Sequence, residues 1–268
     1  MEKITLEESK QYQIGILSSI DAFCRSHDIN YSIAYGTLLG AARHRGFIPW
    51  DDDIDIVMLR KDYDRFVESY SDEHYRLVRG ENIANHLHVV VTDPSTVVKF
   101  DEGTTDALFY KGGVWVDIFP LDNVPDDDGD YEKIKKKIYQ RRFLQRYGEV
   151  SPVNKGDWAI KKFVKRIVHV FLALTKDYNG AKALKLMRTY NTTKTNKVAN
   201  FAVWYLKNNQ SIPSKWFDDY IELEFEGRRF RAIKNYIDYL VSLYGDWQKL
   251  PPPSEQVPKH NYEAYKYN

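Results

Sequence analysis

The 268-residue sequence predicts an α/β (α+β) fold, with a mixed β-sheet core, flanking helices and a helical C-terminal elaboration. Short apolar runs of strand type alternate with amphipathic helical segments through the first half of the chain. From Tyr131 onward the pattern changes to long helices rich in Lys and Arg. We therefore expect a core at 1–125, a helical subdomain at 126–220, and a C-terminal hairpin, helix and tail at 221–268 that packs back on the core.

Hydrophobic periodicity places the elements of the core. Thr5 and Glu8 form a capping-box pattern, and apolar residues at helical spacing extend the first helix to about His27. A turn at Gly36-Thr37 separates the first expected strand from a short helix, and its backbone N–H groups should point beyond the strand end. The expected strands span 29–35, 54–59, 86–92, 96–100 and 114–119, and the expected helices between them span 38–43 and 62–70.

The second half of the chain is expected to be mainly helical. A hairpin about Glu226-Gly227 is predicted at 221–233, and Pro251 opens a tail without helical or strand periodicity. The predicted helices lie near 131–147, 157–174, 180–191 and 236–244.

Charge and composition exclude several classes of function. The chain has 39 basic and 38 acidic residues, a balance that gives no general field for binding nucleic acid. No run approaches the roughly 20 apolar residues that span a bilayer, and the N-terminus lacks a signal-peptide pattern. We expect a cytoplasmic protein, with the periphery of the inner membrane face as a further location. The single cysteine, Cys24, lies among apolar positions and is predicted to be a buried small hydrophobe.

The strongest chemical signal is the segment Trp50–Val57, in which acidic and aliphatic residues alternate at the start of a strand. Alternation places Asp53 and Asp55 on one face. Two converging carboxylates repel each other unless a cation lies between them, and hard oxygen ligands favour Mg²⁺ or Mn²⁺. The alternative is an acidic turn that leads into a strand.

A third acidic residue, Asp117, makes the metal interpretation the better one. It lies in the apolar strand Gly113–Pro120, where it is either a buried charge with a partner or a ligand of the same cation. The second possibility explains all three carboxylates together. Asp122, beyond Pro120, is expected to be solvated or to support the ligands from behind.

Basic residues between the turn and the aspartates are candidates for contact with phosphate. Arg43, His44 and Arg45 form a positive stretch that either clamps phosphate oxygens or balances the neighbouring acids. His86 and His88 share a strand face, but no further ligand stands at zinc spacing, so we expect them to be packing or surface residues.

The string Tyr35–Asp55 resembles the LicD family, which includes bacterial phosphorylcholine transferases and is related to the fukutin group. Val116–Asp122, Leu223–Arg228 and Tyr239–Pro252 share the resemblance, so it covers most of the chain. It implies a nucleotidyltransferase-like core. The family pattern carries over to the Gly36-Thr37 turn, the pair Asp53 and Asp55, and Asp117 on a neighbouring strand. The loop at 43–50 is longer than in ordinary nucleotidyltransferases.

The resemblance also implies a reaction. The expected donor is a CDP-alcohol, most often CDP-choline, and the expected acceptor is a glycan hydroxyl, with lipid-linked glycans among the candidates. Asp53 and Asp55 are expected to hold the cation against the donor pyrophosphate, and Asp117 to complete the metal shell and take the hydroxyl proton, so that CMP leaves. The alcohol (choline, ethanolamine, ribitol or glycerol), the sugar and the oligomeric state stay open.

Two other functions are consistent with the same residues. A nucleotidyltransferase would use the same ligands and release pyrophosphate from an NTP. A non-catalytic phosphocholine- or carbohydrate-binding module would use the 20 tyrosines instead, although three carboxylates suit that purpose poorly. The aromatic and proline-rich tail at 245–268 is expected to fold over the donor site, where His260 would contact phosphate or acceptor.

Overall fold

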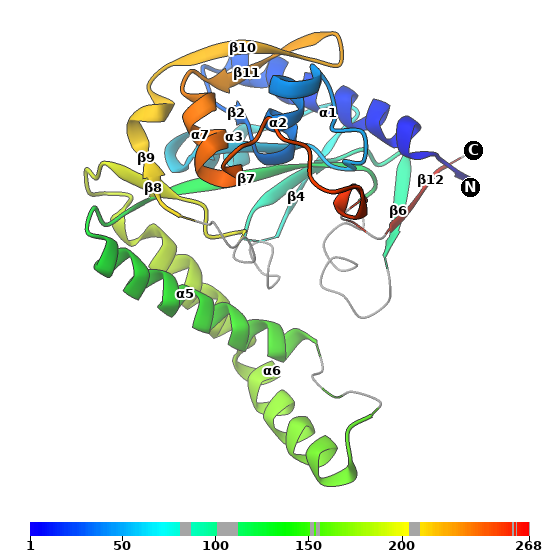
Figure 1. Cartoon of the computed structure of the whole chain (residues 1–268). Helices are drawn as coiled ribbons and strands as arrows, with labels where there is room; N and C mark the ends of the chain where they lie inside the picture. Colours follow the sequence, from blue (N-terminus) through cyan, green and yellow to red (C-terminus); the bar gives the residue numbers. More distant parts are fainter. Residues whose placement is uncertain are drawn as a thin grey trace.

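A mixed β-sheet forms the centre of the molecule in the computed structural model (Figure 1). The structure describes residues 1–80, 87–100, 112–150, 153, 156–203, 210–258, 260 and 262–267. Only β3 and β7 are parallel, and their other neighbours are antiparallel. The strand order is β2 (Ser32–Ile33), β3 (Asp55–Leu59), β7 (Trp115–Val124), β5 (Val89–Thr92) and β4 (Arg76–Arg79). The predicted α+β class with a mixed sheet is confirmed.

The first helix, α1 (Leu6–Ser26), confirms the capping-box prediction. The Thr5 hydroxyl accepts from the backbone N–H of Glu8 at 3.2 Å, and the Glu8 carboxylate accepts from the backbone N–H of Thr5 at 2.8 Å. The apolar face of α1 is fully buried and includes Cys24, as its sequence neighbours predicted. The other helices that surround the sheet are α2 (Tyr35–His44), α3 (Arg60–Ser69) and α7 (Tyr236–Tyr244).

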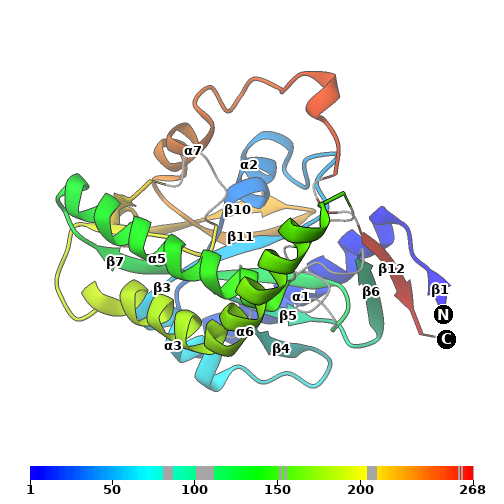
Figure 2. The same ribbon diagram turned by 90° about the horizontal axis from the view of Figure 1, so that it is seen from below.

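Two smaller sheets flank the main one. β10 (Tyr220–Phe225) and β11 (Arg228–Ile233) form the predicted hairpin, and both turn residues, Glu226 and Gly227, have positive φ as tight hairpin turns require. β12 (Tyr262–Lys266) lies between β1 (Glu2–Lys3) and β6 (Thr96–Phe100), so both ends of the chain lie side by side (Figures 1 and 2). The prediction of a tail without strands is therefore wrong at β12.

A pair of long helices, α5 (Asp128–Glu149) and α6 (Ala159–Met187), packs together and extends away from the sheet (Figure 1). The two predicted helices 157–174 and 180–191 are one continuous helix, α6. The Asn179-Gly180 pair resembles a turn but packs against α5, where Asn179 accepts from Arg141 at 3.0 Å and a side chain on Gly180 would meet Gln145. None of the helices in the described ranges has a stretch long and apolar enough to cross a bilayer.

Other differences from the prediction have local causes. The strand expected at 29–35 is confined to β2 because Tyr35, at φ 45°, already begins α2, which includes Gly36 and Thr37. Tertiary pairing extends β7 beyond its predicted end, because β8 (Lys197–Ala199) pairs with its last residues and with β9 (Ile212–Pro213). Three 3₁₀ turns complete the described elements: Arg188–Tyr190, Ser214–Phe217 and Pro253–Glu255.

Candidate active site

Three carboxylates converge where β3 and β7 begin. The parallel register pairs Asp55 directly with Asp117, and Asp53 precedes Asp55 by two residues. Carboxylate oxygens of all three lie within 4.8 Å of one another. The structure thus brings together the aspartates that the sequence pattern selected.

Asp117 is held by hydrogen bonds to both of its carboxylate oxygens. His88 Nε2 lies 2.8 Å from Oδ1, and the Trp115 indole donates to Oδ2 at 2.7 Å. The carboxylate is buried, and so is His88, which packs against the Phe119 ring. His88 was predicted to be a packing or surface residue, and its contact with Asp117 was not predicted. The available signal was the position of His88 directly before the apolar strand β5. His86 lies outside the described residues.

The start of α2 positions the acidic segment. The Thr37 hydroxyl accepts from the backbone N–H of Asp55 at 2.8 Å, which ties the helix to β3. A Cβ on Gly36 would lie 2.5 Å from Asp51 Oδ2, so only glycine leaves room for that buried carboxylate beside the helix N-terminus. Gly36 and Thr37 were predicted to contact substrate. In the structure they contact Asp51 and Asp55, and any role toward substrate stays a prediction.

The tail brings a cation to the acidic cluster. Asp52 Oδ2 accepts from the backbone N–H of His260 at 3.0 Å, Asp52 Oδ1 lies 3.0 Å from its Nδ1, and Asp53 Oδ2 lies 3.7 Å away. Burial disfavours the charged imidazole, but the hydrogen bond to Asp52 and the charges of Asp53 and Asp117 outweigh it and raise the pKa of His260 to about 9. His260 is therefore a charged imidazolium at neutral pH. It also contacts Trp115 edge to face, with ring centroids 5.8 Å apart.

The basic stretch 43–45, which was expected in a loop, forms the last turn and C-cap of α2 and is anchored at both sides. Arg43 donates to the Trp247 carbonyl at 2.9 Å and to His44 Nε2 at 2.9 Å, which joins this stretch to the start of the tail. Arg45 adopts a left-handed conformation, and its carbonyl accepts from the backbone N–H of Glu226 at 2.9 Å in the hairpin turn. His44 and Arg45 are exposed. The predicted contact of this stretch with phosphate stays a prediction.

Asp122 does not behave as a solvated residue. It is fully buried and accepts from Arg60 Nε at 2.7 Å and from Arg60 Nη2 at 2.8 Å. Asn191 adds a third hydrogen bond at 2.6 Å. The prediction of a solvated Asp122 is wrong because the chain returns through β8 and the preceding turn to cover it.

The donor set of the acidic cluster fits a hard divalent cation. Asp53, Asp55 and Asp117 offer carboxylate oxygens only, at a spacing that one ion can bridge. No neutral imidazole or thiolate takes part in this set, so Mg²⁺ or Mn²⁺ suits it better than zinc.

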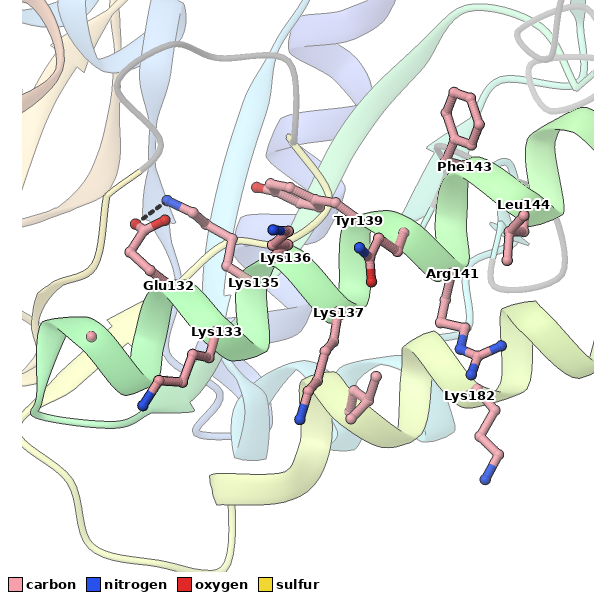
Figure 3. A pocket seen from close by; sticks show the side chains of 13 residues that line it. Glu132, Lys133, Lys135, Lys136, Lys137, Tyr139, Arg141, Phe143, Leu144 and Lys182 are labelled. Carbon is pink, nitrogen blue, oxygen red and sulfur yellow. Dashed lines mark hydrogen bonds and ion pairs between the residues drawn. The ribbon is translucent and has the colours of Figure 1, made fainter.

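A broad open depression elsewhere on the surface is a poor candidate for this chemistry. It follows α5, and its lining includes six basic residues and one acidic residue, Glu132, with none of the clustered aspartates among them. Figure 3 shows Lys133, Lys137 and Lys182 extending outward from the two helices. Its open shape and excess of positive charge do not suit it to hold a metal cation.

The chain is similar to several known proteins. Residues 28–155 match the model described as LicD/FKTN/FKRP, nucleotidyltransferase domain. The lipopolysaccharide cholinephosphotransferase LicD of Haemophilus influenzae is 32% identical over 99% of both chains. The ribitol 5-phosphate transferase FKRP of Mus musculus is 30% identical over 31% of this chain and 19% of its own. An uncharacterized protein of Rickettsia prowazekii is 37% identical over 21% of this chain and 24% of its own. From the full-length match and the match to the family model, the chain belongs to the LicD family.

Proposed function

We propose that this LicD-family phosphotransferase transfers a phospho-alcohol, with phosphocholine from CDP-choline as the preferred donor group, to a hydroxyl of a cell-surface glycan precursor. The carrying observation is the convergence of Asp53, Asp55 and Asp117 in a chain similar along its whole length to a lipopolysaccharide cholinephosphotransferase. We place the reaction in the cytoplasm.

Asp53, Asp55 and Asp117 would hold the divalent cation. When bound, Mg²⁺ or Mn²⁺ would supply positive charge beside the donor pyrophosphate and lower the barrier to departure of CMP. The protein also supplies a cation of its own, His260, whose Nδ1 lies 3.7 Å from Asp53 Oδ2 and which partly offsets the repulsion among the acids.

The transfer step needs a base and a leaving group. The acceptor hydroxyl oxygen forms a bond to the distal phosphorus of the CDP-alcohol, the bond from that phosphorus to the bridging oxygen breaks, and CMP leaves with the electron pair. In this proposal Asp117 would receive the hydroxyl proton, while His88 and Trp115 hold its carboxylate in position. These two partners act by positioning the carboxylate.

An aromatic ring near the acidic cluster supports the proposal that the transferred alcohol is positively charged. Tyr244, at the end of α7, keeps 39% of its surface exposed. Burial of its hydroxyl and the charges of Asp55, Asp51 and Asp53 raise its pKa, so the hydroxyl stays neutral and lies within the field of the acids. Contact between a desolvated quaternary ammonium and such a ring contributes about 2 kcal/mol.

One assay tests the proposal against its alternatives. The protein is incubated with Mg²⁺ or Mn²⁺, a panel of CDP-alcohols that includes CDP-choline and CDP-ribitol, NTPs, and lipopolysaccharide or its precursors. Release of CMP with transfer to the glycan supports the proposal, release of pyrophosphate supports a nucleotidyltransferase, and no product from any donor supports a binding module.

The metal ligands are tested separately. Asp53→Asn and Asp55→Asn should each lower turnover by about three powers of ten or more, while thermal melting without metal stays close to that of the wild type, because each change relieves repulsion. A variant that retains activity within about tenfold of the wild type would rule out the metal assignment.

A further inference from the structure

The first half of α6 exposes an unusual amount of apolar surface. Ile160, Phe163, Ile167, Phe171 and Leu174 recur at helical spacing and are 63%, 64%, 55%, 65% and 82% exposed. Exposed apolar residues also lie beside this stripe, including Trp158, Val164 and Val170. A contiguous apolar face of this kind on a surface helix indicates a binding partner.

The position of this half-helix leaves it free of the protein core. Every buried residue of α6 lies at Leu172 or later, where the helix packs on α5. Figure 1 shows the first half of α6 at the far end of the helical pair, the part of the molecule most distant from the sheet. Nothing in the described part of the chain covers the stripe.

Charge identifies the kind of partner. Between Trp158 and Lys176 the sequence contains no Asp or Glu, and its charged residues are Lys161, Lys162, Lys165, Arg166 and Lys176. Asp157, just before this stretch, pairs with Lys161 at 2.9 Å and with Lys165 at 2.5 Å. The basic surface along α5 adds further positive charge on the same helical pair (Figure 3). Apolar and aromatic residues interleaved with Lys and Arg are typical of helices that lie in the headgroup region of anionic bilayers.

We propose that the first half of α6 docks the enzyme on an anionic lipid bilayer, with Phe163, Phe171 and Leu174 inserted among the headgroups and the exposed Arg166, which flanks the stripe, against lipid phosphates. The helix lies in the interface and does not span the membrane. A second copy of the chain fits less well, because a symmetric contact through this face would bring its basic residues against the same basic residues.

Vesicle binding tests the docking surface without donor or acceptor, so its outcome is independent of the transfer reaction. The full-length protein is co-sedimented with vesicles of phosphatidylethanolamine and phosphatidylglycerol, and with vesicles of phosphatidylcholine alone. Binding to the anionic vesicles should be at least about tenfold stronger and should weaken in high salt. Phe163→Ser/Phe171→Ser and Arg166→Glu should each lower binding by about tenfold or more.

Matched controls keep the test specific. Ile237→Ser and Lys234→Glu change exposed residues on or beside α7, away from α6, and they should leave vesicle binding unchanged. Circular dichroism and thermal melting establish that each variant is folded. Wild-type protein that stays in the supernatant with both vesicle types overturns the proposal. So does a wild-type dimer in light scattering that Phe163→Ser/Phe171→Ser converts to a monomer without a change in vesicle binding.

Discussion

The two aspartates of β7 show how one strand can use the same side chain in opposite ways. Asp117 and Asp122 are both buried, and their odd spacing of five directs them to opposite faces of a regular strand. Asp122 meets the Arg60 guanidinium through two hydrogen bonds and a third from Asn191. Asp117 meets other carboxylates, with His88 and Trp115 as its hydrogen-bond donors.

The difference between their neighbours distinguishes a buried aspartate that stabilises the fold from one that is available for chemistry. A carboxylate paired with arginine has its charge compensated within the fold, so it needs no ligand. A carboxylate grouped with two others leaves negative charge to be compensated by something that binds. Burial alone therefore does not identify a functional aspartate, and the sign of its neighbours does.

The largest expected effect is at the acidic end of the strand. Asp117→Asn keeps an oxygen and the side-chain shape but removes a charge and a proton acceptor, so turnover should fall by about three powers of ten or more. Stability should change by only about 1 kcal/mol, since one acceptor for His88 or Trp115 remains. Steady-state kinetics and urea unfolding measure the two quantities. A large loss of stability with nearly normal turnover in the folded fraction would reverse the assignment.

The ion pair between Arg60 and Asp122, at the other end of β7, should show the opposite result. Arg60→Met leaves Asp122 buried without its cation and should cost about 3–5 kcal/mol of unfolding free energy, while turnover of the folded protein stays within about threefold. The double variant Arg60→Met/Asp122→Asn should recover part of this loss, because the uncompensated charge is gone. If the double variant is as unstable as Arg60→Met, charge is not the reason for the loss.

A smaller effect is expected for the cation that the tail supplies. His260→Gln keeps a hydrogen-bonding side chain near Asp52 but removes the imidazolium, so transfer should slow by about 10–100-fold, and more donor should be lost to water. Deletion of the whole tail is a less clean test than it seems from the sequence, because it also removes β12 and uncovers β6. Product analysis by separation of phosphocholine from the glycan product distinguishes hydrolysis from transfer. Transfer at the wild-type rate would assign the His260 contact to structure alone.

Cys24 extends the comparison to a buried group within the apolar face of α1. Its substitution should have the smallest effect on activity. Burial raises the pKa of the Cys24 thiol to about 12, so the thiolate is scarce in the folded protein and becomes abundant only above that pH. Alkylation by iodoacetamide at pH 8.5 should be at least about a hundredfold slower than in urea, and Cys24→Ala should retain full activity. Rapid alkylation of the native protein would show that the α1 face opens.

The sequence predicted the grouping of the three aspartates better than the residues that support them. Alternation selected Asp53 and Asp55, and the apolar setting of Asp117 selected the third residue, while the parallel register that pairs Asp117 with Asp55 is known only from the structure. The partners of Asp117 and Asp122 could not be predicted in this way. His88 and Arg60 reach β7 from other elements through tertiary packing, which no local pattern records.

The same reason explains the missed elements. β12 has few residues and forms because β6 and β1 accept it on both sides. The break expected within α6 at Gly180 does not occur, because the missing side chain lets α5 approach.

The contact between Asp52 and His260 joins residues separated by 208 positions, and this contact has a consequence for how the protein fails. His260 lies in the C-terminal segment, and chain ends are among the parts of a protein that open at the lowest free energy. The C-terminal segment that contacts Asp52 should therefore be the first part to open as denaturant rises. Enzymatic activity should disappear at a lower urea concentration than the far-ultraviolet signal of the helices, and the metal ligands should outlast the tail that shields them.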